Sequence, residues 1–88
     1  MINLDNFQLY LMREERSENT ISCYLRDVKS FFVWYGKEPE RITEFDLIAY
    51  KRYLLAKEKT VITSNRKLAS VNAFCRYLYD ARLLPEAY

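Results

Sequence analysis

The sequence has few residues that favour tight turns. One Gly and two Pro occur among its 88 residues, a scarcity that argues against a turn-rich β fold. Hydrophobic residues nevertheless make up 50% of the chain and aromatic residues 16%, which is enough to fill an interior. Only one core fits a chain of this length, since domains commonly run to about 100–150 residues. The composition therefore predicts a single all-α domain, with a helical bundle as the default architecture.

Histidine is absent and cysteine is rare. Cys23 and Cys75 lie in different expected helices, and no CxxC motif or Cys/His cluster accompanies them. The sequence also has no glycine-rich phosphate loop and no acidic cluster suited to a metal ion. We therefore expect no cofactor and no metal site, and we expect reduced thiols of the kind found in cytoplasmic proteins.

Long hydrophobic runs are missing as well. No segment approaches the roughly 18–20 apolar residues that a membrane-spanning helix needs. The N-terminal stretch MINLDNFQLYLMREE lacks the basic region followed by an apolar core that marks a secretion signal. These absences lead us to expect a soluble, cytoplasmic protein that does not bind a membrane.

The charges divide unevenly between two parts of the chain. Residues 1–50 carry six Arg or Lys against nine Asp or Glu, a balance of −3, whereas residues 51–88 carry eight against three, a balance of +5. An imbalance of this size also arises by chance. It makes the second part the better candidate surface for a polyanion such as nucleic acid.

The segment 59–82 has the pattern of one long helix. Its apolar residues recur at the spacing of a core-facing stripe, which comprises Leu68, Val71, Phe74, Cys75 and Leu78. The opposite side combines cations, amides and small residues, namely Asn65, Arg66, Ala69, Asn72, Ala73 and Arg76, flanked by Lys67 and Ser70. Small residues let a helix approach a groove while Arg and Asn reach bases or phosphates. Because merely solvated helices also show charged faces, this pattern alone leaves both interpretations open.

A second amphipathic helix is expected between Ser17 and Gly36. Ser17 is a favourable N-cap, and Gly36 readily adopts the left-handed conformation that ends helices. Its apolar stripe comprises Ile21, Tyr24, Leu25, Val28, Phe31, Phe32 and Tyr35. The opposite line holds Asn19, Cys23, Arg26 and Ser30, which again suits either a solvated or a binding face. Trp34 lies off the stripe, and we expect it to contact a neighbouring helix rather than to stack on a base.

Two shorter helices complete the expected bundle. The first covers Leu4–Glu14, with Asn3 able to cap it. In the other, Thr43 and Asp46 form a capping box, and the helix runs to about residue 57. The core face of this helix is expected to comprise Leu47, Ile48, Leu54 and Leu55.

The connections are expected to be short. Residues 37–41, which include Pro39, read as a linker. A turn near Lys59 precedes the long last helix, for which Thr63 is the expected cap. This last helix is expected to end at residues 80–82. Pro85, just beyond it, prevents the helix from continuing.

Taken in order, several short motifs resemble the N-terminal core-binding domain of tyrosine recombinases, the phage integrase family. They are S-E-N-T at residues 17–20, F-F-x-W at 31–34, I-T-E-F-D at 42–46 and T-S-N-R-K-L at 63–68. The resemblance implies a SAM-like bundle of four to five helices that forms one jaw of a clamp around duplex DNA. A separate C-terminal catalytic domain would form the other jaw. Residues 1–84 would then be the core-binding domain and residues 85–88 the start of a linker.

The resemblance also implies which residues contact DNA, because the second and fourth helices of the family lie across the major groove. On the second helix these residues are Asn19, Thr20, Cys23, Arg26 and Lys29. On the fourth helix they are Thr63, Ser64, Asn65, Arg66, Lys67 and Ser70, with the last at the margin. The interpretation requires Arg26 and Arg66 to lie on one surface of the molecule.

No catalytic residue is assigned to this chain. The family cleaves DNA with a Tyr nucleophile assisted by Arg, Lys and usually His, all in the catalytic domain, and this chain has no His. An isolated tyrosine, with a pKa of about 10, is a poor nucleophile. We therefore predict a DNA-binding module of a site-specific recombinase. Its partners would be duplex DNA, its own catalytic domain and other recombinase protomers.

The alternative is a free-standing helical domain that binds a protein. In that case the contact would use exposed aromatic side chains, for which Trp34, Tyr53 and Tyr79 are the candidates. A self-sufficient enzyme is disfavoured, because no set of nucleophile, base and orienting group can be assembled from the sequence.

Overall fold

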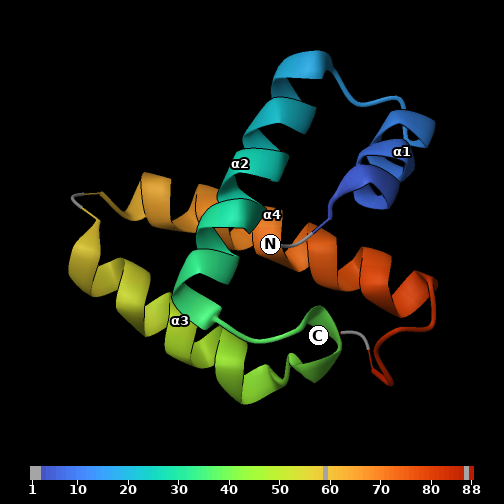
Figure 1. Cartoon of the computed structure of the whole chain (residues 1–88). Helices are drawn as coiled ribbons and strands as arrows, with labels where there is room; N and C mark the ends of the chain where they lie inside the picture. The colour runs from blue at the N-terminus through green and yellow to red at the C-terminus, as the bar shows by residue number, and fades with distance from the viewer. Residues whose placement is uncertain (1–2, 59, 87) are drawn as a thin grey trace.

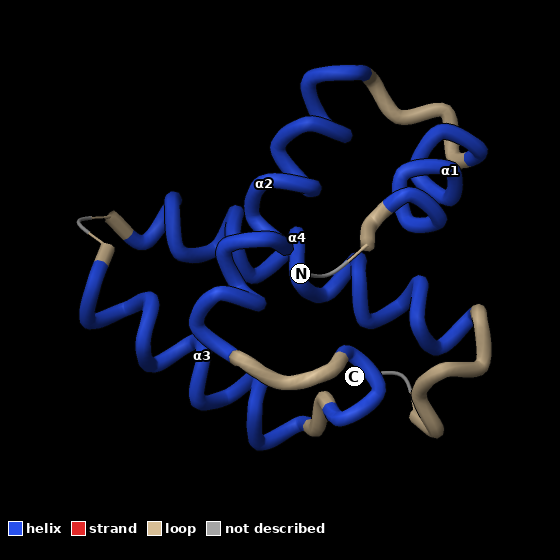
Figure 2. Tube along the Cα trace, in the orientation of Figure 1, coloured by secondary structure: helices blue, strands red, loops and turns tan. Residues whose placement is uncertain are grey.

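The computed structural model describes residues 3–58, 60–86 and 88. Over this part of the chain the elements are α1 (Asp5–Arg13), α2 (Glu18–Tyr35), the short 3₁₀ helix η1 (Pro39–Arg41), α3 (Glu44–Lys57) and α4 (Val61–Asp80). Short loops join the helices, and no strand occurs among the described residues (Figure 2). The all-α prediction is confirmed.

The ends of α2 and the start of α3 follow the capping residues in the sequence. Ser17 Oγ accepts a hydrogen bond from the Thr20 backbone N–H at 3.2 Å, and Gly36 ends α2 with a φ of 71°. At α3, Thr43 Oγ1 accepts from the Asp46 N–H at 3.3 Å while the Asp46 carboxylate accepts from the Thr43 N–H at 2.9 Å. The predicted capping box is confirmed.

Two other helix starts differ from the prediction. The N-cap of α1 is Leu4, and Asn3 Oδ1 accepts from the Asp5 N–H at 2.8 Å from one position further out. The cap of α4 is Thr60, whose hydroxyl accepts from the Thr63 N–H at 3.2 Å. The choice of Thr63 as the cap was wrong because an equivalent threonine three residues earlier captures its N–H. The expected turn near Lys59 lies outside the described residues.

The core forms where α2 crosses α4 (Figure 1). α1 packs against both of these helices, and α3 packs against α4. Aromatic rings join the four helices: the Phe7 and Phe74 centroids lie 5.0 Å apart, and those of Phe31 and Tyr50 lie 4.8 Å apart. The fully buried apolar side chains also include Leu11, Val28, Leu54, Val71 and Leu78. The Cα radius of gyration of 12.5 Å matches the value of about 12 Å expected for a compact domain of this length.

The buried face of α3 differs from the one predicted. Leu54 is buried and Leu47 is half-buried, but Ile48 and Leu55 are 45% and 50% exposed. Tyr50 is buried in their place, so the core line runs through residues 47, 50 and 54 at i, i+3 and i+7 spacing. Apolar residues occur all around this helix, which is why periodicity alone did not identify the inner side.

Trp34 contacts a neighbouring helix, as its position off the α2 stripe predicts. Its ring lies 5.1 Å from that of Tyr50 and 5.5 Å from that of Tyr53, both in α3. Within the described residues, no helix is both long enough and apolar enough to cross a membrane. Beyond α4, Leu84 is buried, and the expected division between a domain ending at residue 84 and a linker over 85–88 stays a prediction.

Candidate nucleic-acid interface

A buried carboxylate lies at the crossing of α2 and α4. The side chain of Asp27 is 2% exposed, and its Oδ2 accepts hydrogen bonds from Arg66 Nη1 and from Ser70 Oγ, each at 2.8 Å. Arg26 Nε lies 4.0 Å from Oδ1 of the same carboxylate. Arg26 on α2 and Arg66 on α4 therefore flank a single negative charge. The two arginines thus lie on the same side of the molecule, as the interpretation of the sequence requires.

The first half of α2 presents the other polar side chains expected at this surface. Asn19 and Lys29 are exposed, and the Arg26 side chain is 68% exposed. Thr20 is half-buried, and its Oγ1 accepts a hydrogen bond from Ser17 Oγ at 2.9 Å. Cys23 is half-buried, and Arg26 Nη2 lies 3.7 Å from its sulfur. These side chains are accessible to different degrees, and both cations among them, Arg26 and Lys29, are exposed.

On α4 the expected residues divide between surface and interior. Asn65 is exposed, Thr63 is half-buried, and the Arg66 side chain is 40% exposed. The Lys67 side chain is 18% exposed and forms an ion pair with Glu58, the residue that follows α3. Lys67 therefore ties α3 to α4, and part of its charge is already neutralised within the domain.

The expectation that Ser64 and Ser70 contact DNA is not supported by their burial. Both residues are at most 1% exposed. Ser64 Oγ donates to the Thr60 carbonyl at 3.3 Å, and Ser70 Oγ donates to Asp27. Ser64 precedes the buried Val71 by seven residues, and Ser70 precedes the buried Phe74 by four, so helical periodicity places both on the inner face. The expectation came from the family resemblance and, for Ser70, from its place at the flank of the polar side.

Sequence reasoning missed Asp27. The residue lies at the border of the α2 apolar stripe, directly before the buried Val28 and four residues before the buried Phe31. That placement is an available signal, because a carboxylate at a core-facing position must find a partner. The partners come from α4, about forty positions further along the chain, and no local pattern identifies them.

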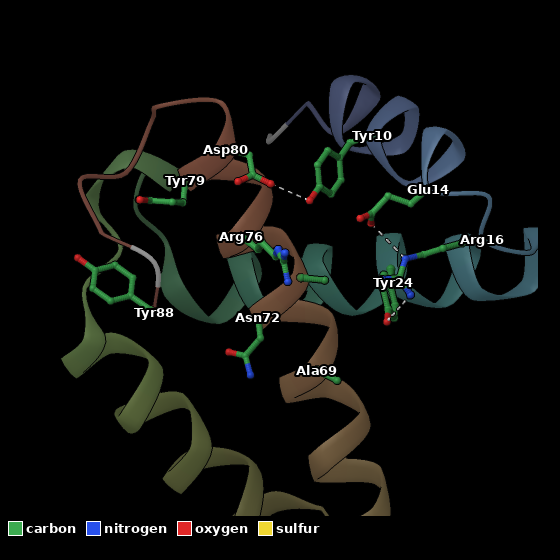
Figure 3. Close-up of a pocket in the computed structure, with 11 residues that line it drawn as sticks. Tyr10, Glu14, Arg16, Tyr24, Ala69, Asn72, Arg76, Tyr79, Asp80 and Tyr88 are labelled. Atoms are coloured by element: carbon green, nitrogen blue, oxygen red, sulfur yellow. Dashed lines mark hydrogen bonds and ion pairs between the residues drawn. The ribbon is translucent and has the colours of Figure 1, made fainter.

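An open groove lies between α4, from Ala69 onwards, and the end of α1 (Figure 3). Its volume is about 580 Å³, and Ala69, Asn72, Ala73 and Arg76 form its α4 side. On the opposite wall Arg16 Nε lies 3.4 Å from Glu14 Oε1, and its guanidinium lies 5.3 Å from the centre of the Tyr24 ring.

The charges in this groove balance. Arg16 and Arg76 stand against Glu14 and Asp80. The Tyr10 hydroxyl donates to Asp80 at 3.0 Å, and burial together with this hydrogen bond raises the pKa of Tyr10. The groove is therefore not an anion site in its own right.

Tyr35, which is half-buried, and Tyr50, which is buried, are the opposite of activated nucleophiles. Burial, followed by the hydrogen bond to Asp46, raises the pKa of Tyr35 to about 12, and burial likewise raises the pKa of Tyr50 to about 12. A nucleophilic Tyr needs its pKa lowered by nearby cations. Among the residues that the structure describes, no group of three or more His, Cys, Asp or Glu side chains is arranged to hold a metal ion.

Comparison with known families identifies the domain. The family model described as phage integrase, N-terminal SAM-like domain, matches residues 4–82. The chain belongs to this family. The SAM-like integrase domain is also similar to the tyrosine recombinase XerD of Agrobacterium fabrum (strain C58 / ATCC 33970), with 33% identity over 85 residues.

The match covers 91% of this chain and 25% of the relative, so the chain spans about a quarter of that recombinase's length. No solved structure matches this chain in a search of known structures. The resemblance noted from the sequence motifs is confirmed, and so is the SAM-like helical architecture that it implied.

Proposed function

We propose that this integrase-type domain is the DNA-binding module of a site-specific tyrosine recombinase. The parent protein would break and rejoin DNA strands in the cytoplasm, using a catalytic domain that is distinct from this module. The proposal is supported by the family match over residues 4–82. The observation that carries it is the meeting of Arg26 and Arg66, from separate helices, at one carboxylate.

The proposed contact surface is called here the arginine face. It comprises Asn19, Thr20, Cys23, Arg26 and Lys29 of α2 with Thr63, Asn65, Arg66 and Lys67 of α4. α2 and α4 cross at the Asp27 carboxylate. Their polar sides can therefore approach the two DNA backbones that border a major groove, which is about 12 Å wide. We propose that the arginine face forms one half of a clamp on duplex DNA.

Within the arginine face the residues have different proposed roles. Arg26, with 68% of its side chain exposed, and Lys29 are suited to phosphate contacts. Asn65 and Arg66 are suited to base edges, because amides pair with adenine and guanidinium groups with guanine. Asn19 and Thr20 lie in the first turn of α2, where backbone N–H groups and the helix dipole favour a phosphate.

The proposal is tested by measuring duplex binding as a function of salt. We expect a dissociation constant of about 10⁻⁴–10⁻⁶ M for the isolated domain, weakening steeply as salt rises because bound phosphates release counterions. Arg26→Ala, which removes a proposed phosphate contact, should weaken binding and reduce the slope of log K against log salt by about 0.9. Arg66→Ala, which removes a proposed base contact, should weaken binding with a smaller change in that slope. Fluorescence anisotropy with a labelled duplex measures both quantities.

Arg52→Ala is the matched control, because Arg52 is an exposed arginine on α3, outside the arginine face. It should leave both the affinity and the salt slope near their parent values. If Arg26→Ala and Arg66→Ala bind like the parent at low salt while circular dichroism shows them folded, the arginine face does not bind DNA.

A protein-binding role is favoured by one observation on α3. Phe45, Ile48 and Leu55 are 82%, 45% and 50% exposed and share one side of the helix at i, i+3 and i+10 spacing. Of the aromatic residues first considered for this role, Trp34 and Tyr53 suit it less because they stack on each other, whereas Tyr79 is 44% exposed. A complex whose affinity does not change with salt, and which Phe45→Ala abolishes, would support this alternative.

A further inference from the structure

Asp27 is an unusual residue to find beneath a surface proposed to bind a polyanion. It places a negative charge between the two arginines of the arginine face, within 2.8 Å of Arg66 and 4.0 Å of Arg26. That charge repels phosphate and cancels part of the attraction that the arginines supply. If the domain only had to bind DNA tightly, replacing Asp27 with an uncharged residue would increase its affinity.

Folding stability does not explain the residue either. Removing a carboxylate from water is costly, and well-packed apolar residues often replace a buried ion pair without loss of stability. Position 27 lies between α2 and α4 beside buried Val28, where an apolar side chain would extend the core. The carboxylate is therefore better explained by what it does to the side chains around it.

The contacts show what Asp27 holds in place. Its Oδ2 binds Arg66 Nη1, and the buried Ser70 hydroxyl fixes the same oxygen from one turn further along α4. The Arg66 guanidinium carries five N–H donors, and one of them donates a hydrogen bond to Asp27. Nη1 is therefore anchored by one hydrogen bond, while 40% of the side chain is exposed and leaves the other donors available at the surface.

We propose that Asp27 is a positioning residue for DNA recognition, an inference that rests on the proposed function. It orients the Arg66 guanidinium for a two-bond contact with a base edge and, by its charge, weakens binding to phosphates of any sequence. Ser70 supports this role by holding the carboxylate. The Asp27–Ser70 pair thus lowers the affinity for DNA of any sequence and increases the difference in affinity between sequences.

The test compares two duplex probes. One is a random-sequence 30-base-pair pool, and the other is the set of duplexes enriched from that pool by repeated selection with the parent domain. Asp27→Asn keeps the volume, removes the charge, and replaces the charge-assisted hydrogen bond that holds Arg66 with a weaker neutral one. It should bind the random pool roughly two- to fivefold more tightly, because the repulsion is gone. The ratio of enriched to random affinity should fall by roughly fivefold or more, the discrimination of one bidentate contact.

Two further variants separate charge from geometry. Ser70→Ala leaves the Asp27 charge and removes its support, so the enriched-to-random ratio should fall without tighter binding to the random pool. Glu38→Gln is the control. It removes one negative charge from an exposed site before η1 and should preserve the enriched-to-random ratio. Nitrogen-15 NMR of the Arg66 guanidinium without DNA should show hindered rotation in the parent and freer rotation in Ser70→Ala.

Several outcomes overturn the inference. It fails if folded Asp27→Asn keeps the parent's ratio or binds the random pool more weakly. If Asp27→Asn does not fold, Ser70→Ala decides, and an unchanged ratio with unchanged Arg66 rotation contradicts the proposal. A parent that binds the pool but enriches no sequence overturns this inference and leaves the proposed function standing. A parent that binds neither probe contradicts both.

Discussion

At three residues the polarity of the side chain predicts exposure, whereas its position in the helix predicts burial. Asp27, Ser64 and Ser70 are each at most 1% exposed, although their polarity suggests the surface. Each is paired, Ser64 with backbone carbonyl groups and the other two with each other. Buried polar groups must be satisfied in this way, because an unpaired one costs about 1–3 kcal/mol. At the scale of single residues, then, position within the helical repeat is the better guide.

The two cysteines should differ sharply in reactivity. Cys75 is fully buried, and its burial raises the pKa of the thiol to about 12, so little of the reactive thiolate forms. Cys23 is half-buried on the proposed DNA surface. We expect a thiol reagent such as Ellman's reagent to modify Cys23 quickly and Cys75 only after unfolding.

Duplex DNA adds a functional readout to this experiment. If the arginine face binds DNA, saturating duplex should slow the modification of Cys23. Cys23→Ser serves as the control, because it should remove the fast phase entirely. Equal rates for the two thiols in the folded protein would show that the burial assigned to Cys75 is incorrect.

At the scale of whole elements, local sequence determines where most helices begin and end. Ser17, Gly36 and the Thr43–Asp46 box are recognisable without a structure because each acts on N–H or C=O groups within a few residues. The inner face of α3 was not recognisable, since Ile48 and Leu55 are apolar yet exposed. Which side of that helix faces inward depends on α4, and its own sequence does not contain that information.

The capping box of α3 predicts a dependence of stability on pH. Burial alone would raise the pKa of Asp46, but hydrogen bonds from Tyr35 and from the backbone and side chain of Thr43 outweigh it, and the pKa is lowered from 3.8. A carboxyl group with a lowered pKa in the folded state stabilises the protein above its unfolded pKa. That contribution is lost as pH falls through the lower, folded value.

Asp46→Ala should therefore lower the free energy of unfolding by about 1 kcal/mol at pH 7, the usual contribution of such a cap. The difference between variant and parent should shrink as the pH is taken below about 4, the range in which the unfolded carboxyl takes up a proton. Urea denaturation at pH 7 and pH 3 measures this. Glu40→Gln, at an exposed carboxylate of η1, is the control and should match the parent at pH 7. A difference that stays constant with pH would contradict the role given to Asp46.

At the scale of the whole molecule, one aromatic cluster joins α2 to α3. Phe31 is fully buried, and its ring lies 4.9 Å from that of Phe32, 5.3 Å from that of Tyr35 and 4.8 Å from that of Tyr50. Phe31→Ala should lower the free energy of unfolding by about 3–5 kcal/mol, through lost burial and the cavity left behind. This is a large share of the 5–15 kcal/mol that stabilises typical domains.

Val33→Ala is the matched control for this change. Val33 lies two residues further along α2 and is 87% exposed, so its truncation should change stability by about 0.5 kcal/mol or less. Chemical denaturation followed by circular dichroism gives both values. If the two variants were equally stable, the packing of α2 against α3 would have to be different.

The all-α class and the α2 stripe could be predicted from the sequence because they depend on composition and periodicity. The candidate site could be predicted only in outline. Arg26 and Arg66 can be recognised in the sequence as cations on the polar sides of two separate helices, but the two approach each other only through contact with Asp27. That contact depends on how α2 crosses α4, and a crossing is set by packing between distant segments rather than by any local pattern.

The central claim is that duplex DNA binds where α2 crosses α4. The most direct test is a titration of nitrogen-15-labelled domain with a short duplex at low salt, followed by backbone amide NMR. We predict that the largest shifts fall within residues 19–29 and 63–67 and that they disappear as salt is raised. Shifts confined to the outer side of α3, around Phe45, Ile48 and Leu55, or no shifts at all, would contradict the account.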